Sequence, residues 1–248
     1  MTAGRARVLV IGAGGIGSPA LLALGRAPGP IRSLVIVDDD VVQVANLHRQ
    51  ILHPSAHVGM SKVRSAAVAL AHSGLDITTV EARFSPENAA SLLAGCDLVV
   101  DGSDNFATRF LANDACVLAG IPLVHAAAIG WQGQLVAFDP RRGDPCYRCL
   151  FEAAPAPGPG MSCAEAGVVG PVVGVIGSLA AEAAVALLDG TARSTAGVSR
   201  LVVYDGLAGT LRAVSYRRNP LCLACGPAAR PSLDPLAYEV PACSPLHP

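Results

Sequence analysis

The stretch that decides the fold is Arg7-Val-Leu-Val-Ile11, followed at once by Gly12-Ala-Gly-Gly-Ile-Gly17. Its first part is a short, apolar, β-branched run, and residues 19–24 after the glycines are rich in leucine and alanine. This order predicts a strand, a glycine loop and a helix. Such a loop lets backbone amides approach a phosphate, and the helix N-terminus favours the bound anion.

Further strand candidates lie along the rest of the chain. Three short apolar runs are separated by helical stretches: residues 31–37, 97–101 and 121–125. A second set follows Gly130, its last two members joined by a turn-rich segment: residues 134–138, 201–204 and 211–216. Alternating strands and helices predict a parallel sheet, and the hairpin predicts antiparallel additions. We therefore expect an α/β fold with a Rossmann-like, mostly parallel sheet extended by antiparallel strands.

Composition limits the function classes. The chain has 248 residues, 52% hydrophobic and 15% charged, with a net charge of −1, which excludes a disordered or fibrous protein. The near-neutral balance predicts no general affinity for nucleic acid. The first residues run straight into a strand pattern without a secretory signal, so the eight cysteines are expected to be reduced in the cytoplasm.

One apolar segment has the length of a membrane span. Residues 167–188 are mostly apolar but contain Pro171, several glycines and Glu182. We expect a buried core helix, apolar all round, and no membrane partner.

Two segments predict irregular structure. Residues 153–160 are a proline-glycine run, typical of an exposed, mobile loop. The chain after Gly226 is rich in proline and lacks a long apolar run. We therefore expect one domain over residues 1–226 and an extended or disordered tail over residues 227–248.

A nucleotide-binding pattern surrounds the glycine loop. It comprises Gly12, Gly14, Gly15 and Gly17, with Asp38 at the end of the second strand candidate, where a carboxylate can bind ribose hydroxyls. By itself this pattern does not identify the bound nucleotide, and it is equally compatible with NAD. The glycines would also suit a role limited to close packing of strand and helix.

Charged and amide side chains follow Asp38 closely. The segment Asn46-Leu-His-Arg49-Gln50 and Lys62 supply two cations and two amides. A triphosphate needs cations that stabilise charge on the leaving pyrophosphate, whereas nicotinamide enzymes need few such groups. The set favours a triphosphate, the alternative being that Arg49 and Lys62 are solvated surface residues.

The sequence Asp101-Gly-Ser-Asp104-Asn105 closes another strand candidate, at the edge where ligands gather in open α/β sheets. Asp104 is placed to hold Mg²⁺ on the phosphates, directly or through water. Its alternative role is a helix N-cap, which is compatible with metal binding. Arg109 either pairs with an acid of the same site or is structural.

Cysteine spacing gives the strongest signal in the chain. The pairs are Cys146-Tyr-Arg-Cys149 and Cys222-Leu-Ala-Cys225. Four thiolates bind one Zn²⁺ tetrahedrally and leave no open position, so this zinc is expected to be structural. The alternative is four buried or reactive thiols without a metal.

The other cysteines carry less information. Cys163 follows the proline-glycine run, where a thiol can act as a nucleophile, but free cysteine is also among the most commonly buried residues. Cys96, Cys116 and Cys243 show no pattern, and only His48 of the six histidines lies near a suspected site.

Over residues 7–226 these motifs resemble the ThiF/MoeB/HesA family, the ubiquitin-activating-enzyme-like adenylyltransferases of sulfur carrier proteins. The matching motifs are the glycine loop, Asp38-Asp-Asp40, Asn46-Leu-His-Arg-Gln50, Lys62, Ser103-Asp-Asn105 with Arg109, both cysteine pairs and residues 163–174. Asp38-Asp-Asp40 and residues 166–174 look slightly closer to ThiF than to MoeB.

The resemblance implies an enzyme that binds ATP, Mg²⁺ and the tail of a small ubiquitin-like sulfur carrier ending in Gly-Gly. The carrier carboxylate attacks the α-phosphate and forms an acyl-adenylate, for sulfur transfer in thiamine, molybdopterin or related biosynthesis. Carried over by position, Asp38 binds the ribose, and Asp104 binds the magnesium. The residues implied at the phosphates are Asn46, Arg49 and Lys62, and the wider ATP-binding set includes Gln50 and Asn105.

The resemblance also implies partners. Family members are usually homodimers, and in ThiF-like members the cysteine that matches Cys163 can bond covalently to the end of the carrier. No rhodanese-like domain follows Gly226, so we expect a separate sulfur donor, either a cysteine desulfurase or a rhodanese.

Three features depart from the family pattern. Members begin with a helix carrying an Arg-Tyr-x-Arg-Gln motif, whereas here only six residues precede Arg7. Either the true start lies upstream, or Arg5 or a carrier residue substitutes, or adenylylation is weakened. Ala45 replaces the usual serine, and residues 26–30 lengthen the connection to Asp38. The alternatives are a non-catalytic carrier-binding scaffold and an NAD-dependent oxidoreductase.

Overall fold

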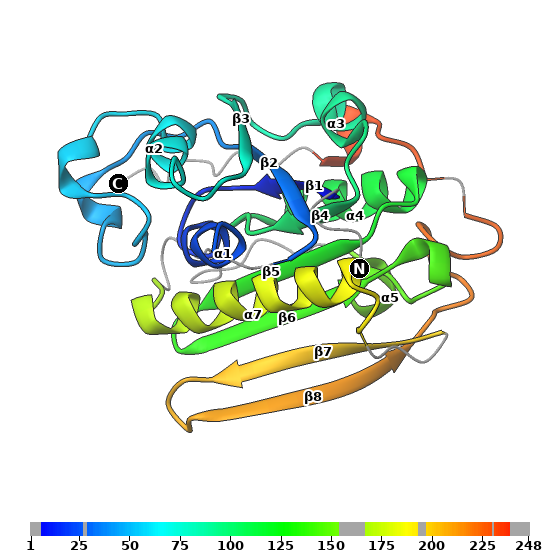
Figure 1. The fold of residues 1–248 in the computed structure, drawn as a ribbon. Coiled ribbons are helices and arrows are strands. Elements are labelled where there is room, and N and C mark those ends of the chain that lie inside the picture. Colours follow the sequence, from blue (N-terminus) through cyan, green and yellow to red (C-terminus); the bar gives the residue numbers. More distant parts are fainter. Residues whose placement is uncertain (1–5, 27–28, 154–166, 193–196, 230, 239–248) are drawn as a thin grey trace, which may run out of the picture.

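The computed structural model describes residues 6–26, 29–153, 167–192, 197–229 and 231–238. In this part of the chain, eight strands form one sheet in the order β3-β2-β1-β4-β5-β6-β7-β8 (Figure 1). The strands are β1 (Ala6–Ile11), β2 (Ile31–Val37), β3 (Asp76–Val80), β4 (Leu98–Asp101), β5 (Leu123–Ile129), β6 (Gln132–Phe138), β7 (Val198–Asp205) and β8 (Thr210–Arg217). Strands β1 to β5 are parallel, and β6, β7 and β8 pair antiparallel. The expected fold class is confirmed.

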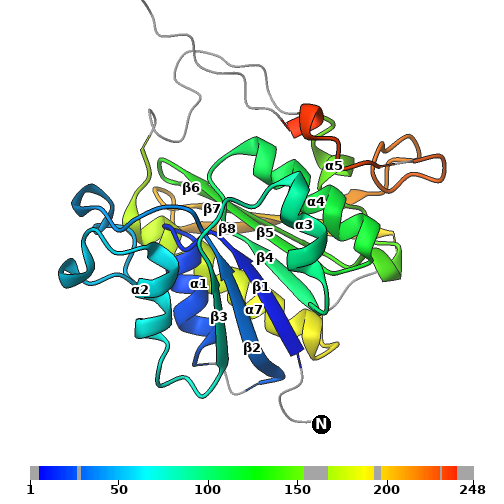
Figure 2. The same ribbon diagram turned by 90° about the horizontal axis from the view of Figure 1, so that it is seen from above.

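Helices cover both faces of the sheet (Figures 1 and 2). They are α1 (Gly17–Leu24), α2 (Lys62–Ala69), α3 (Pro86–Leu93), α4 (Phe106–Ala119), α5 (Tyr147–Leu150) and α7 (Gly170–Leu188). Short 3-10 turns are η1 (Val44–Asn46), η2 (Ser55–His57), η3 (Pro140–Arg142) and η4 (Pro235–Tyr238). Side chains of α1, α2 and α7 enter one core, and those of α3, α4 and α5 enter the other.

Strand β1 shows how one sequence contributes to both cores. Val8 and Val10 pack into the core under α1 and α7, whereas Leu9 and Ile11 pack into the core under α3 and α4. All four side chains are buried. A strand buried on both faces is apolar at successive positions, which is why its sequence is recognisable.

Strand β3 is absent from the strands expected above. Its sequence Asp76-Ile-Thr-Thr-Val80 lies at the edge of the sheet, pairs only with β2, and buries none of its residues fully. An edge strand needs few apolar side chains, so it lacks the apolar run that marks a central strand.

Helix α7 is the one described helix long and apolar enough to cross a membrane. Its Val173, Ile176 and Ala180 pack in the core, while Val175 is exposed, so it is buried along one face and not all round as expected. Gly177 allows close contact with α1, because a Cβ there would lie 2.5 Å from the backbone oxygen of Ile16. The prediction that this helix packs in the core is confirmed, but the prediction that it is buried all round is wrong.

The described end of the tail contradicts the expectation of an extended or disordered segment. Tyr238 in η4 is buried, and its hydroxyl donates to Asp114 Oδ2 at 2.6 Å and lies 3.2 Å from Ser232 O. The buried carboxylate of α4 thus supplies a tertiary partner that proline content does not reveal. The domain boundary at residue 226 stays a prediction, and most of the expected mobile loop at residues 153–160 lies outside the described residues.

Candidate active site and metal centre

A cavity of about 350 Å³ opens at the carboxyl ends of β1, β2 and β4. Its wall includes most of the residues expected to bind ATP: Gly12, Gly14, Gly15, Asp38, Arg49, Gln50, Lys62, Asp104 and Asn105. Gly17 and Asn46 do not line it. Parallel strands all end at this edge of the sheet, so residues far apart in the sequence meet there.

The glycine loop joins β1 to α1 through two restrictive positions. Gly12 has φ +86°, a left-handed conformation that favours glycine. At Gly17 a Cβ would lie 1.9 Å from the carbonyl oxygen of Gly12, so the turn cannot hold a side chain there. Gly17 therefore shapes the loop from behind, while Gly14 and Gly15 present it to the cavity.

Asp38 fixes the loop from the end of β2. The Ala13 N–H donates to Asp38 Oδ2 at 2.7 Å, and the Asp40 N–H donates to Oδ1 at 2.8 Å. Burial raises the pKa of Asp38, and the positive charge of Lys62 opposes that rise. Each carboxylate oxygen keeps a further lone pair, so a ribose hydroxyl can still donate to this group.

Lys62 begins α2 and is held by Asp40. Its Nζ lies 2.6 Å from Asp40 Oδ2, and its backbone N–H donates to the carbonyl of Asp40 at 2.9 Å. The lysine side chain is buried, contrary to the alternative of a solvated surface residue. The Lys62 ammonium is therefore part of the cavity wall, where it can bind an anion.

Asn46, Arg49 and Gln50 form one tight turn that begins at the last residue of η1. The carbonyl of Asn46 accepts the N–H groups of Arg49 at 3.1 Å and Gln50 at 3.0 Å. This turn directs Arg49 and Gln50 to the cavity, whereas Asn46 supports them through its backbone. The Arg49 side chain also lies beside the loop, its Cδ 3.6 Å from the position of a Cβ on Gly15.

The segment after β4 assigns the helix cap to a different residue than proposed above. Asn105, not Asp104, caps α4, because its Oδ1 accepts the N–H of Thr108 at 2.9 Å. Asp104 is exposed and lines the cavity. Its carboxylate is thus available to a cation bound with the phosphates.

A buried pair anchors this segment. His125 Nδ1 lies 2.8 Å from Asp101 Oδ2, and the Ser103 N–H donates to Asp101 Oδ1 at 2.9 Å. Burial alone would raise the pKa of Asp101, but the hydrogen bonds from His125 and Ser103 outweigh it and lower that pKa. Burial lowers the pKa of His125, so a neutral imidazole donates to a carboxylate.

Arg109 is buried in the cavity wall without a carboxylate partner among the described residues. Its guanidinium donates to the carbonyl of Ser103 at 3.3 Å and stacks over Phe106 with 5.0 Å to the ring centroid. Of the two roles considered for Arg109, pairing with an acid is not seen among the described residues, and its contacts with Ser103 and Phe106 brace a side chain that lines the cavity.

Three buried polar atoms of the cavity wall lack a hydrogen-bond partner within the described chain: Gln50 Oε1, Ser103 Oγ and Arg109 Nε. A buried polar group without a partner costs about 1–3 kcal/mol, so such groups mark places where a ligand or water completes the structure. Arg109 Nε and the Ser103 hydroxyl can donate to an anionic nucleotide, whereas Gln50 Oε1 can only accept, as from a ribose hydroxyl or water.

Some residues of the site carry no sequence signal that we used. Arg83 and Phe84 line the cavity because they follow β3, the edge strand missed above. His125 and His53 are buried behind the site and stand outside any motif. Asp40 belongs to a recognised motif, but only its contact with Lys62 indicates what it does.

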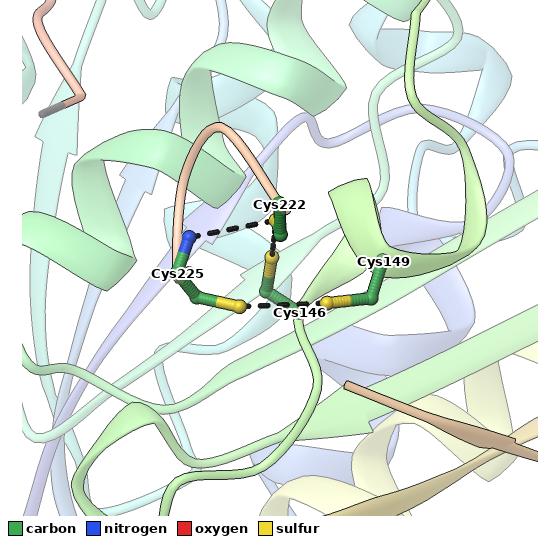
Figure 3. A group of neighbouring side chains, drawn as sticks. All are labelled: Cys146, Cys149, Cys222 and Cys225. Carbon is green, nitrogen blue, oxygen red and sulfur yellow. Dashed lines mark hydrogen bonds between the residues drawn. The ribbon is translucent and has the colours of Figure 1, made fainter. Parts of the chain in front are cut away.

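The four motif cysteines meet at one point, as Figure 3 shows. Cys146 Sγ lies 3.6 Å from Cys222 Sγ, and Cys149 Sγ lies 3.4 Å from Cys225 Sγ. Four sulfurs at about 2.3 Å from a tetrahedral zinc stand about 3.8 Å apart, so these side chains fit the metal. Two pairs far apart in the sequence thus form a candidate zinc site.

Backbone donors suit thiolates in this cluster, and the pKa shifts divide the four cysteines into two pairs. The N–H of Asn219 donates to Cys149 Sγ at 3.4 Å, and the N–H of Cys225 donates to Cys222 Sγ at 3.5 Å. Hydrogen bonds among the four thiols lower the pKa of Cys222 and, to about 6, that of Cys225, whereas the pKa values of Cys146 and Cys149 are raised. Sulfur atoms this close favour a shared cation over four neutral thiols. Cys163, by contrast, lies outside the described residues.

These features define a Rossmann-type nucleotide-binding domain with a four-cysteine cluster. Residues 2–224 match the model of the ThiF family, so the chain belongs to that family. The recognition made from the motifs is confirmed.

Named relatives agree with this assignment. The chain is 44% identical over 243 residues to the sulfur carrier protein adenylyltransferase of Thermus thermophilus, covering 94% of this chain and 88% of that protein. It is 43% identical over 234 residues to the SAMP-activating enzyme E1 of Haloferax volcanii, covering 94% and 84%. It is 42% identical over 222 residues to the adenylyltransferase and sulfurtransferase MOCS3 of Dictyostelium discoideum, covering 88% of this chain and 51% of that protein. The chain is therefore a nucleotidyltransferase, of the adenylyltransferase type.

Solved structures share the fold at low sequence identity. E. coli MccB with ATP has a TM-score of 0.75 and 19% identity, covering 89% of this chain and 67% of that chain. E. coli MccB with MccA-N7isoASN has a TM-score of 0.74 and 20% identity, covering 90% and 68%. These matches confirm the arrangement of the sheet and helices.

Proposed function

We propose that this enzyme adenylylates the C-terminal carboxylate of a small ubiquitin-like sulfur carrier ending in Gly-Gly. The names of the Thermus and Haloferax relatives support this class of substrate. The observation that carries the proposal is the convergence of the glycine loop, Arg49, Gln50 and Lys62 on one cavity with unpartnered buried polar atoms.

We assign the nucleotide contacts from positions in the cavity wall. Asp38 binds the ribose hydroxyls, and the amides of Gly14 and Gly15 approach the phosphates. Arg49, Gln50 and Lys62 bind the phosphates, and Asn46 supports that turn. Asp104, next to Asn105, is the residue that would hold Mg²⁺, whose positive charge would neutralise phosphate oxygens.

The reaction is an exchange of bonds at the α-phosphorus. A carboxylate oxygen of the carrier bonds to this phosphorus while the bond to the bridging oxygen breaks, and pyrophosphate leaves with the electron pair. Negative charge grows on the leaving group, so Arg49 and Lys62 stabilise the transition state more than the ground state. The product is an acyl-adenylate with a carbonyl that a sulfur nucleophile can attack.

We further propose the surrounding functions that the family resemblance implies. The four cysteines hold a structural zinc that ties the segment after β8 to α5. Cys163 is a candidate for covalent attachment of the carrier, and a separate cysteine desulfurase or rhodanese supplies sulfur. The enzyme acts as a cytoplasmic homodimer, and thiamine synthesis is slightly favoured over molybdopterin synthesis.

An ATP–pyrophosphate exchange assay with candidate Gly-Gly carriers tests the proposal. Carrier-dependent exchange is the expected result. Carrier binding without exchange would instead identify a non-catalytic scaffold. Reduction of a nicotinamide cofactor, with neither exchange nor carrier binding, would identify an oxidoreductase and overturn the proposal.

A further inference from the structure

Two histidines and a serine form a hydrogen-bonded chain behind the glycine loop. His53 Nε2 lies 2.8 Å from the carbonyl oxygen of Ala13, and His53 Nδ1 lies 2.8 Å from Ser65 Oγ. The same hydroxyl lies 2.8 Å from His57 Nδ1. His53 and Ser65 are buried, and none of these three side chains lines the cavity.

The Ala13 carbonyl at the end of these hydrogen bonds determines where each proton lies. A carbonyl oxygen only accepts, so His53 carries its proton on Nε2. Burial lowers the pKa of His53, which favours the neutral ring, and its Nδ1 must then accept. Ser65 therefore donates its single proton to His53, and His57 can reach the serine oxygen only as a donor from Nδ1.

This chain ends on the peptide group that shapes the phosphate loop. The Ala13 N–H is held by Asp38, and the Ala13 carbonyl is held by His53, so the residue is fixed from both sides. The carbonyl and N–H of a trans peptide point in opposite directions. The bond to His53 thus turns the Gly14 N–H away from the histidine, and Gly14 is part of the cavity wall.

We propose that His53, oriented by Ser65 and His57, is a positioning residue that presents the Gly14 N–H to a bound nucleotide phosphate. The inference rests on the proposed use of ATP and adds a residue that does not touch the nucleotide. Without the imidazole, the Ala13 carbonyl keeps only the longer bond from Ser18 Oγ at 3.4 Å, so its peptide is held less firmly.

Histidine ring ¹⁵N NMR of the full chain without nucleotide, at about pH 8, tests the proton arrangement. His53 should be the Nε2–H tautomer and His57 the Nδ1–H tautomer, and Ser65→Ala should abolish the preference of His57. An Nε2–H tautomer at His57 in the wild-type chain would overturn the inference. This readout needs no activity, and a residue that only fills space would not produce it.

Binding of ATP to folded variants tests the consequence. His53→Leu should weaken binding about tenfold, the upper range for the loss of one hydrogen bond, whereas His53→Gln keeps a donor and should stay within about threefold of the wild type. The exposed His72 provides the matched control, and His72→Leu should bind as the wild type does.

The outcomes separate this inference from the proposed function. Wild-type binding by a folded His53→Leu variant would overturn the positioning role alone. Absence of ATP binding in the wild-type chain would overturn the proposed function as well. If His53→Leu does not fold, the tautomers of His53 and His57 and the response to Ser65→Ala decide the matter.

Discussion

Lys62 Nζ lies 2.6 Å from Asp40 Oδ2, and the two partners differ sharply in exposure: the lysine side chain is 5% exposed and the aspartate side chain 66%. The buried cation is therefore neutralised by a carboxylate at the cavity surface. A bound triphosphate would place a second anion near the Lys62 ammonium. The ammonium could then exchange Asp40 for a phosphate oxygen as its partner.

Replacing Asp40 tests this relationship. Asp40→Asn leaves the buried ammonium without a charged partner and should lower the free energy of unfolding by about 1 kcal/mol, since exposure of the carboxylate screens the pair. Saturating MgATP should stabilise the variant more than the wild type, as measured by thermal unfolding. Asp76→Asn is the control, because Asp76 lies outside the cavity wall and 4.0 Å from an exposed Arg32. Equal responses to ATP in all three proteins would contradict the expectation.

Replacing Asp104 should impair catalysis without affecting folding. Asp104→Ala should reduce ATP–pyrophosphate exchange by at least about 100-fold, because it removes the exposed carboxylate placed to hold Mg²⁺. The unfolding temperature should not change, since the cap of α4 belongs to Asn105. Asp189→Ala, at an exposed aspartate outside the cavity, serves as the control. Retained exchange in Asp104→Ala would remove this residue from the mechanism.

The loop glycines should differ in their response to alanine. At Gly17 a Cβ would lie 1.9 Å from the Gly12 carbonyl oxygen, so Gly17→Ala should cost at least about 3 kcal/mol of stability. At Gly14 the nearest atom is the Gln50 Nε2 at 3.7 Å, so Gly14→Ala should fold normally. Its methyl group faces the cavity and should weaken ATP binding about tenfold, measurable by calorimetry. A stable Gly17→Ala protein would show that the loop adapts.

Metal content tests the cysteine cluster. Elemental analysis of the purified chain should find about one zinc per molecule, because four thiolates at these distances suit one tetrahedral ion. Cys222→Ser should lose the metal and at least about 2 kcal/mol of stability. Cys96→Ser is the matched control, a buried thiol outside the cluster that bonds to the Leu92 carbonyl at 3.2 Å. A folded wild-type protein with four free thiols and no zinc would defeat the assignment.

Stability should depend on pH through His125. Burial lowers its pKa below the ordinary value of 6.5, so as the pH falls through 6.5 the unfolded chain takes up a proton that the folded chain does not. The free energy of unfolding should therefore fall, by about 1.4 kcal/mol for each unit of pKa difference once the pH is below both values. Asp101 has a lowered pKa, and its contribution is lost only as the pH falls below 3.8.

Urea unfolding at about pH 7.5 and pH 5.5 measures this effect. Zinc release also depends on pH, so the comparison that matters is between the wild type and His125→Gln. The variant should lose less stability between the two pH values, because it lacks His125 but keeps His53, and burial lowers the pKa of both. An identical loss in both proteins would assign the pH dependence elsewhere.

Several parts of the fold and site follow from local sequence. Residues 7–17 specify a strand, a loop and a helix start, because a doubly buried strand is apolar throughout and the turn demands glycine at Gly17. The two Cys-x-x-Cys pairs predict that the four cysteines come together, since one tetrahedral zinc takes two ligands from each pair. In the glycine loop, neighbours in the sequence are neighbours in space, whereas the two cysteine pairs lie 76 residues apart and only their ligand chemistry predicts that they meet.

Tertiary structure alone decided the rest. β3 is an edge strand with few apolar residues, and Tyr238 is buried only because α4 offers Asp114. The partnership of His53 with Ala13 joins residues forty positions apart, and no local pattern encodes it. Composition and periodicity report the environment that a segment needs on average, whereas a single hydrogen bond depends on where two distant segments meet.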